Sequence, residues 1–227
     1  MKAGLTFRRW PERPESPSPD DNMTAAFEKI KTFPLHSRTP IEWGVAVLAD
    51  PIALLIDHAF LEKKAANNAM ELMTQWPGDW TPGWVETMTN VARDEASHLA
   101  QVVRILMKRG GRLARGHKSD YASSLRLLVR KGDQPEVLDR LFVSALIELR
   151  SCERFAILSM AAQDEELAVF YKGLFASELT HYKVFLKLAY KIAPKAKVDA
   201  RWQQMLAAEA EIIARQLPGP RIHSGIA

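Results

Sequence analysis

The sequence of 227 residues has a single cysteine, few glycines and no excess of proline, and each of these features excludes a class of protein. Its single cysteine excludes an internal disulfide framework and a thiolate-rich metal site, and it suits a reducing compartment. Thirteen prolines and eleven glycines are too few for a fibrous or wholly disordered chain. No uninterrupted apolar run reaches the roughly 20 residues of a membrane helix, and the first residues lack the apolar stretch of a signal peptide. We therefore expect a cytoplasmic protein without a membrane partner.

The composition changes near residue 38. Residues 10–22 (WPERPESPSPDDN) are rich in proline, serine and charge, and such a segment cannot bury enough apolar area to fold. We predict a disordered tail over residues 1–37 and one helical domain over residues 38–227, a length that can bury a sizeable core.

From Thr39 onwards the sequence repeats the signals that start and stop helices. Predicted N-caps, most of them followed by proline, are Thr39, Asp50, Thr81, Gln134 (or Asp133) and Asp164. Apolar residues recur between these points at helical spacing, and no alternating strand pattern appears. The predicted long helices cover residues 51–76, 82–109, 135–163 and 164–192. Shorter ones cover 40–49, 119–131 and 198–216.

The connections between the long helices predict the fold class. Tight turns join the first helix to the second and the third to the fourth, whereas about 25 residues separate the two pairs. Two antiparallel hairpins with one long crossover form the ferritin-like variant of the four-helix bundle. We therefore predict an all-α, ferritin-like four-helix bundle with additional short helices.

Two of the long helices carry the same local motif, a glutamate followed three residues later by a histidine. Glu95 and His98 lie in the second long helix, and Glu178 and His181 lie in the fourth. A spacing of three places carboxylate and imidazole on one helix face, so both can reach the same metal pair. One such motif arises easily by chance, but two, each in the later helix of a hairpin, indicate a site.

A di-iron carboxylate bundle needs one more glutamate from each of the other two helices. Glu62 fits, because the turn at 77–82 lies close to the midpoint between Glu62 and Glu95. On the third helix the same argument of equal height favours Glu148 opposite Glu178. The spacing from Asp57 to Glu62 repeats from Glu148 to Glu153, which favours Glu153 instead. We predict Glu148 as the ligand and keep Glu153 as the alternative.

Four carboxylates and two imidazoles suit iron or manganese, and four negative charges balance two Fe(II) ions. We expect Asp94 and Asp57 to orient the histidines, because metal-bound imidazoles usually donate their other N–H. The competing interpretation is that each of these residues forms an ion pair on the surface of an amphipathic helix. That interpretation fits any single residue better than it fits the whole set.

The net charge of +4 hides a local basic stripe. Residues 104–118 hold six lysines and arginines and no carboxylate: Arg104, Lys108, Arg109, Arg112, Arg115 and Lys118. Such a stripe can attract an anionic partner such as nucleic acid, although a solvated helix end and loop would have the same composition.

Several segments resemble the bacterial tRNA hydroxylase family that acts on 2-methylthio-N6-isopentenyladenosine. They are LLIDHAFLEKKAA, ARDEASHLAQVVRILMKRG, DYASSLR, IELRSCERFA, FYKGLFASELTHYKVFLKLA and the terminal IHSGI. The resemblance covers residue 40 to the C-terminus. It implies a non-haem di-iron monooxygenase that uses two iron ions, bridged by Glu95 and Glu178, with O2 as co-substrate and two electrons from an unidentified donor.

The resemblance also supplies a partner for the basic stripe, the tRNA anticodon stem-loop, whose modified adenosine lies next to the anticodon. Arg150 and Arg154 are further candidates for contact with RNA. The alternative functions are a ferritin-like iron-oxidising or storage protein, a di-iron hydroxylase of another substrate such as a lipid quinone, and a metal-free RNA-binding bundle.

Overall fold

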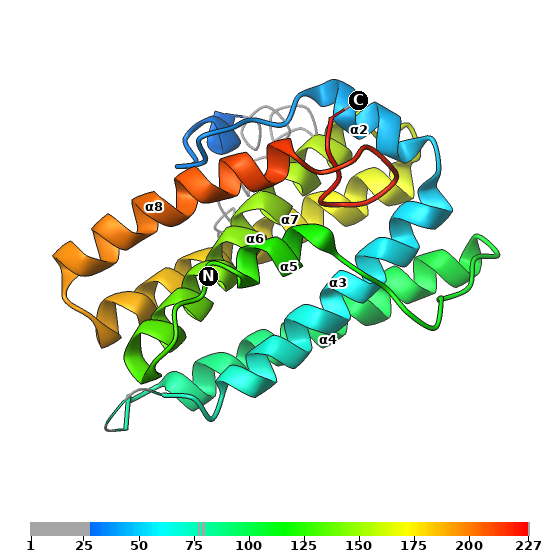
Figure 1. Cartoon of the computed structure of the whole chain (residues 1–227). Coiled ribbons are helices and arrows are strands. Elements are labelled where there is room, and N and C mark those ends of the chain that lie inside the picture. The colour runs from blue at the N-terminus through cyan, green and yellow to red at the C-terminus, as the bar shows by residue number, and fades with distance from the viewer. Residues whose placement is uncertain (1–27, 77, 79, 227) are drawn as a thin grey trace, which may run out of the picture.

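The structure is a computed structural model that describes residues 28–76, 78 and 80–226, and within these residues it contains helices and no strand (Figure 1). The helices are α2 (Ile41–Leu48), α3 (Pro51–Leu72), α4 (Trp84–Lys108), α5 (Asp120–Arg126), α6 (Asp133–Ala161), α7 (Glu165–Ile192) and α8 (Lys195–Ala214). Every predicted helix is present, with ends that differ by a few residues. The predicted all-α class is confirmed for this part of the chain.

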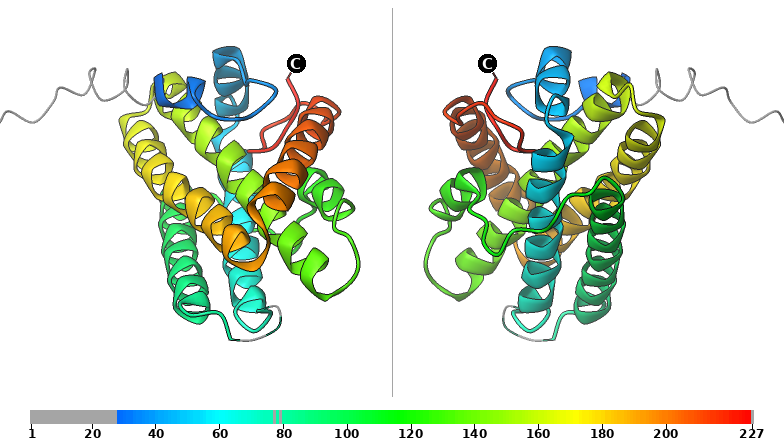
Figure 2. Two further views of the ribbon diagram at one scale, coloured as in Figure 1. Left: turned by 90° about the vertical axis from the view of Figure 1, so that its left-hand side faces the viewer. Right: turned by 90° about the vertical axis from the view of Figure 1, so that its right-hand side faces the viewer.

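Helices α3 and α4 form one antiparallel hairpin, and α6 and α7 form the other (Figures 1 and 2). The crossover between the hairpins carries α5, as predicted. Helix α6 is buried on every side because α2, α5, α7 and α8 all pack against it. This arrangement confirms the predicted ferritin-like connectivity and brings the four long helices around a shared interior.

The helix starts follow the predicted signals only in part. Asp50 caps α3 by accepting a hydrogen bond from the Ala53 N–H, and Asp164 caps α7 in the same way through Leu167. The caps predicted at Thr39, Thr81 and Gln134 (or Asp133) are wrong: α2, α4 and α6 begin after Pro40, Gly83 and Gly132 instead. The two glycines have positive φ angles, of 76° and 107°, which a side chain disfavours.

The prediction of a disordered tail over residues 1–37 is wrong for residues 28–37. Residues 28–37 pack onto the bundle, with Ile30, Phe33 and Leu35 each 5–6% exposed. The Arg38 guanidinium also donates to the Phe33 carbonyl, which ties the segment down. Burial of these three apolar side chains contributes to holding the segment against the folded bundle. Residues 1–27 lie outside the described part of the chain.

The interior of the bundle is mostly apolar, and the buried polar side chains include the two clusters described below. At the tight turn of the first hairpin, the Trp84 indole N–H donates to the Leu72 carbonyl at 2.8 Å. The hairpin is thus closed by a buried hydrogen bond next to two fully buried side chains. Among the described helices no single one is long and apolar enough to cross a membrane, and α2 with α3 passes that test only as a pair bent by 105°.

Candidate metal centre

Six acidic and imidazole side chains meet in the interior of the bundle. All six are buried, with exposed fractions between 1% and 7%. They come from all four long helices: Glu62 from α3, Glu95 and His98 from α4, Glu148 from α6, and Glu178 and His181 from α7. These are the six residues that the sequence analysis selected as metal ligands.

The six side chains form two overlapping groups whose ligand atoms lie within 4.8 Å of one another. One group contains Glu62 and His98, the other contains Glu148 and His181, and Glu95 and Glu178 belong to both. Each group thus has one histidine and one glutamate of its own and shares two glutamates. This is the arrangement expected of two adjacent ions joined by bridging carboxylates.

Both histidines direct Nδ1 toward the carboxylates. His181 Nδ1 lies 2.7 Å from Glu95 Oε1 and 3.2 Å from Glu178 Oε2. His98 Nδ1 lies 3.2 Å from Glu178 Oε1 and 3.5 Å from Glu95 Oε2. The spacing of three residues within each motif produces this geometry, because it places both side chains on the interior face of their helix.

Three polar atoms in the cluster suggest a place for metal. Glu95 Oε1, His98 Nδ1 and Glu178 Oε1 are buried and form no well-aligned hydrogen bond among the described residues, and their near neighbours are the other acidic and imidazole groups of the cluster. Buried carboxylates and imidazoles held this close without well-aligned hydrogen bonds are rare and destabilising. Two divalent cations would satisfy the lone pairs and neutralise four carboxylates at once. The oxygen and imidazole donors therefore fit iron or manganese.

The cluster holds protons when no metal is bound. Burial, together with the carboxylate of Glu178, raises the pKa of Glu95 to about 8. Burial alone would lower the pKa of His98, but the adjacent carboxylates of Glu178, Glu62 and Glu95 outweigh it and raise the pKa to about 12. Hydrogen bonding and charge in the same cluster raise the pKa of His181 to about 10, again against burial. Metal binding must therefore displace protons.

The two candidates on α6 occupy different environments. Glu148 lies in the cluster, whereas Glu153 accepts hydrogen bonds from Thr39 and from the Arg150 guanidinium. Equal height along the hairpin therefore identifies the residue on α6 that joins the cluster. The spacing from Asp57 to Glu62, which repeats from Glu148 to Glu153, does not. Arg150 and Arg154 are each 1% exposed, so the suggestion that they contact RNA is wrong.

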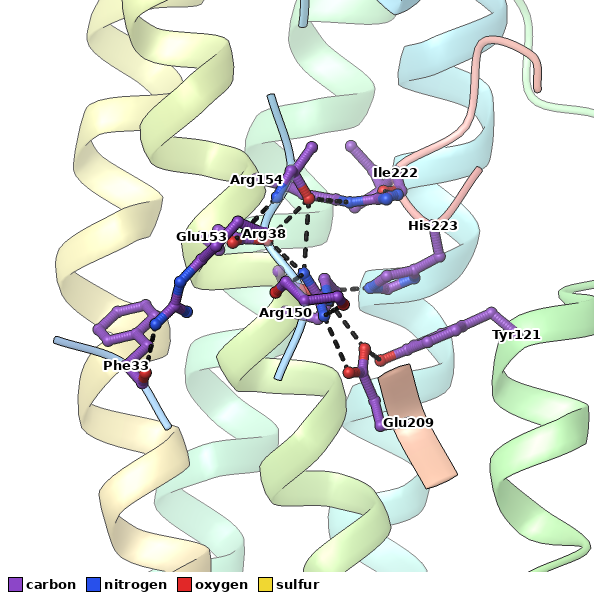
Figure 3. A network of polar contacts seen from close by, with 12 residues as sticks. Phe33, Arg38, Tyr121, Arg150, Glu153, Arg154, Glu209, Ile222 and His223 are labelled. Atoms are coloured by element: carbon purple, nitrogen blue, oxygen red, sulfur yellow. Dashed lines mark hydrogen bonds and ion pairs between the residues drawn. The ribbon is translucent and has the colours of Figure 1, made fainter. Parts of the chain in front are cut away.

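Arg150 is the centre of a second buried polar network (Figure 3). Its Nε and Nη2 donate to the two carboxylate oxygens of Glu209 on α8, both at 2.8 Å, and Tyr121 on α5 donates to the same carboxylate. Arg154 donates to the Ile222 carbonyl in the C-terminal segment. The network thus joins α5, α6, α8 and the C-terminal segment behind the metal centre.

The two aspartates predicted to orient the histidines have different positions. Asp94 Oδ2 lies 3.6 Å from His181 Nε2, on the side of the ring that faces away from the cluster. Asp57 instead accepts from His117 Nε2 at 2.6 Å and from the backbone N–H of Ile222 at 2.8 Å. Asp57 therefore holds the crossover and the C-terminal segment together, and it contacts neither predicted ligand histidine.

His58 is the residue that the sequence analysis missed. Its Nε2 lies 2.6 Å from Glu62 Oε1, and the ring is fully buried among Phe155, Phe170 and Tyr171. Burial lowers its pKa to about 4, so the ring is neutral, and its Nε2–H can donate to Glu62 when that side chain is an ionised carboxylate. The spacing of four from Glu62 was a usable signal, but surface pairs on many helices have the same spacing.

The six predicted RNA-binding residues divide into two groups. Lys108 and Arg109 pair with Asp164 and Glu166 at the start of α7, and Lys118 pairs with Asp120. In the described part of the chain Arg104, Arg112 and Arg115 are exposed and form no hydrogen bond or ion pair. Of the six, these three are the cations most available to an anionic partner.

The fold and the buried cluster place the chain in the class of ferritin-like helical proteins with a candidate two-metal centre. A model of the tRNA-(MS[2]IO[6]A)-hydroxylase (MiaE) family matches residues 26–224. The chain therefore belongs to this family, as the resemblance in the sequence suggested.

Two relatives bear the name of this hydroxylase, and a solved structure shares the fold. The chain is 42% identical over 188 residues to the tRNA 2-(methylsulfanyl)-N(6)-isopentenyladenosine(37) hydroxylase of Pseudomonas putida. This match covers 83% of this chain and 90% of that protein. The Salmonella typhimurium protein of the same name is 32% identical over 75% of this chain and 61% of its own length. A solved structure, "Protein 43 with aldehyde deformylating oxygenase activity from Synechococcus", superposes with a TM-score of 0.78 at 32% identity, covering 84% and 96% of the two chains.

Proposed function

We propose that this chain is an O2-dependent tRNA hydroxylase that acts on the isopentenyl group of 2-methylthio-N6-isopentenyladenosine next to the anticodon. The observation that carries the proposal is the convergence of the six ligands in two overlapping groups, in a chain that belongs to the hydroxylase family. A tRNA substrate also implies that the protein works in the cytoplasm.

Two iron ions held by the six residues would supply the O2 activation that an unactivated C–H bond requires. Glu95 and Glu178 would help to hold both ions, and each histidine would help to hold one of them. The burial of the six side chains, each between 1% and 7% exposed, limits the contact of the site with water. One oxygen atom enters the C–H bond and the other leaves as water, which requires two electrons and two protons from outside the chain.

Mass spectrometry of nucleosides tests this proposal. Iron-loaded, reduced protein is incubated with 18O2 and tRNA that carries the isopentenyl adenosine. The modified nucleoside should gain one labelled oxygen atom, and none without O2 or without iron. If fully iron-loaded and reduced protein adds no oxygen, the chain is not this hydroxylase.

His58 should be needed to position Glu62 for its ion. In His58→Phe the donor to Glu62 Oε1 is lost, while the aromatic surroundings accept the new ring. We expect the affinity for one of the two ions to fall about 10–100-fold, as for other residues that orient metal ligands. In His58→Gln the amide N–H can take the place of Nε2–H, and most of the affinity should return. Titration with Mn²⁺ measures both variants, and wild-type binding of two ions by His58→Phe would contradict the role.

The three unpaired arginines should bind RNA phosphates. Replacing Arg104, Arg112 and Arg115 with alanine should weaken binding of an anticodon stem-loop and flatten the dependence of log Kd on log salt by about 0.7–0.9 per lost phosphate contact. The matched control is Lys197→Ala, an exposed cation at the start of α8, at the other end of the bundle. A salt dependence unchanged in the triple variant would show that RNA binds elsewhere.

A further inference from the structure

A cavity of about 710 Å³ opens between α4 and α7 and reaches the metal centre at His98. Its walls include His98, Arg104, Ile105, Phe170, Gly173 and Leu174. His98 is 7% exposed, the highest value among the six candidate ligands. A molecule in this cavity would therefore contact His98, one of the candidate ligands, without a large movement of the helices.

The size of the cavity suits a modified base. Pockets that bury a small organic ligand usually measure about 300–1,000 Å³. A second cavity, between α3, α5 and α6, reaches the cluster at Glu148, but it measures only about 160 Å³. That volume can take a small group and cannot hold a purine with its two substituents. Size therefore favours the cavity at His98.

The lining of the larger cavity also suits a purine with an apolar side group. Ile105, Leu174 and Phe170 offer apolar surface, and Phe170 is an aromatic ring on which a base can stack. Gly173 is a glycine within the body of α7, where it is less favourable than alanine by about 1 kcal/mol. Gly173 is exposed, and a Cβ added at this position would meet nothing within 4 Å, so open space lies beside the helix here.

The charge around the cavity suits the backbone of an RNA loop. Arg104 lies in the wall, exposed, and pairs with no described residue. It is the first cation of the basic stripe, which continues into the crossover beyond the end of α4. The carboxylate of Glu166 at the rim is neutralised by Lys108 and Arg109, which leaves Glu165 as the remaining negative charge.

We propose that this cavity binds the modified base itself, flipped out of the anticodon loop, with its isopentenyl group directed toward His98 and Phe170 beneath the purine ring. Extrusion of a base is least unfavourable from a loop that is already single-stranded. The assignment rests on the proposed function, and it makes Gly173 the residue that admits the base.

The test compares two stem-loops that differ only at the target base, one with the isopentenyl-modified adenosine and one with plain adenosine. Their Kd values are measured with metal-loaded protein in the absence of O2. Wild-type protein should prefer the modified stem-loop. Gly173→Phe fills the cavity, so the ratio of the two Kd values should fall by about tenfold or more. This change is comparable with the loss of one stacked base. Its metal content and melting temperature should remain those of the wild type.

Two further variants make the result decisive. Gly173→Ala adds only a methyl group and should keep the preference, whereas Ala122→Phe fills the smaller cavity and should also keep it. If Gly173→Phe still prefers the modified stem-loop, or if Ala122→Phe alone loses the preference, the assignment is overturned. If wild-type protein shows no preference, the proposed function itself fails.

Discussion

Replacing Glu178 with alanine is expected to remove both metal ions and with them the hydroxylase activity. Glu178 is 1% exposed and belongs to both groups of ligand atoms, so its loss takes one oxygen donor from each ion position. The loss of affinity should exceed the roughly 10–100-fold that follows when a residue behind a ligand is changed. Titration with Fe²⁺ or Mn²⁺ and analysis of the metal content of the purified variant measure the effect.

Glu62→Ala provides the comparison, because Glu62 belongs to one group only. This variant should still bind one ion, held by the group around Glu148 and His181. Glu211→Ala removes an exposed carboxylate on α8 and should bind two ions as the wild type does. The bridging arrangement is refuted if Glu178→Ala keeps two ions at wild-type affinity, or if it loses no more than Glu62→Ala.

The second large effect is on stability and concerns Arg150. In Arg150→Met the buried carboxylates of Glu153 and Glu209 lose their cation, since Arg150 contacts both and all three are nearly inaccessible to solvent. Breaking a buried ion pair from one side lowers the free energy of unfolding by about 3–5 kcal/mol. For a domain of this size the melting temperature should fall by roughly 6–20 °C, measured by calorimetry on the metal-free protein.

A second step distinguishes the uncompensated charge from a packing defect. Adding Glu153→Gln and Glu209→Gln to Arg150→Met removes both orphaned charges and should recover much of the lost stability. Arg215→Met, at an arginine whose side chain is 78% exposed, should change the free energy of unfolding by less than about 0.5 kcal/mol. For a domain of this size, 1 kcal/mol of unfolding free energy corresponds to roughly 2–4 °C in melting temperature. A melting temperature of Arg150→Met within about 2 °C of the wild type would therefore refute the account.

The sequence predicted the helices and the cluster of candidate metal ligands because both depend on residues that are near one another along the chain. Proline, glycine and capping residues mark the helix ends, and in an antiparallel hairpin the distance from the turn sets the height of each side chain. Glu62 therefore meets Glu95, and Glu148 rather than Glu153 meets Glu178. Local sequence was enough for these pairs because tight turns join the two helices of each hairpin.

Contacts between distant segments could not be predicted. Arg150 looked like a surface cation because its partner Glu209 is 59 residues away on α8. Residues 28–37 follow a proline-rich stretch, and only the docking surface on the folded bundle explains why Phe33 and Leu35 are buried. His58 has the spacing of an ordinary surface pair with Glu62, and its importance appears only when the aromatic rings of α6 and α7 enclose it.

The two hydrogen bonds of Asp57 make one carboxylate the joint between the basic crossover and the end of the chain. One oxygen binds His117 of the crossover and the other binds the N–H of Ile222. If either segment moved away, one carboxylate oxygen of Asp57, the residue before His58, would lose its hydrogen-bond donor. The His58 ring contacts Glu62, so a displacement of the crossover would disturb α3 about one and a half turns before that candidate metal ligand.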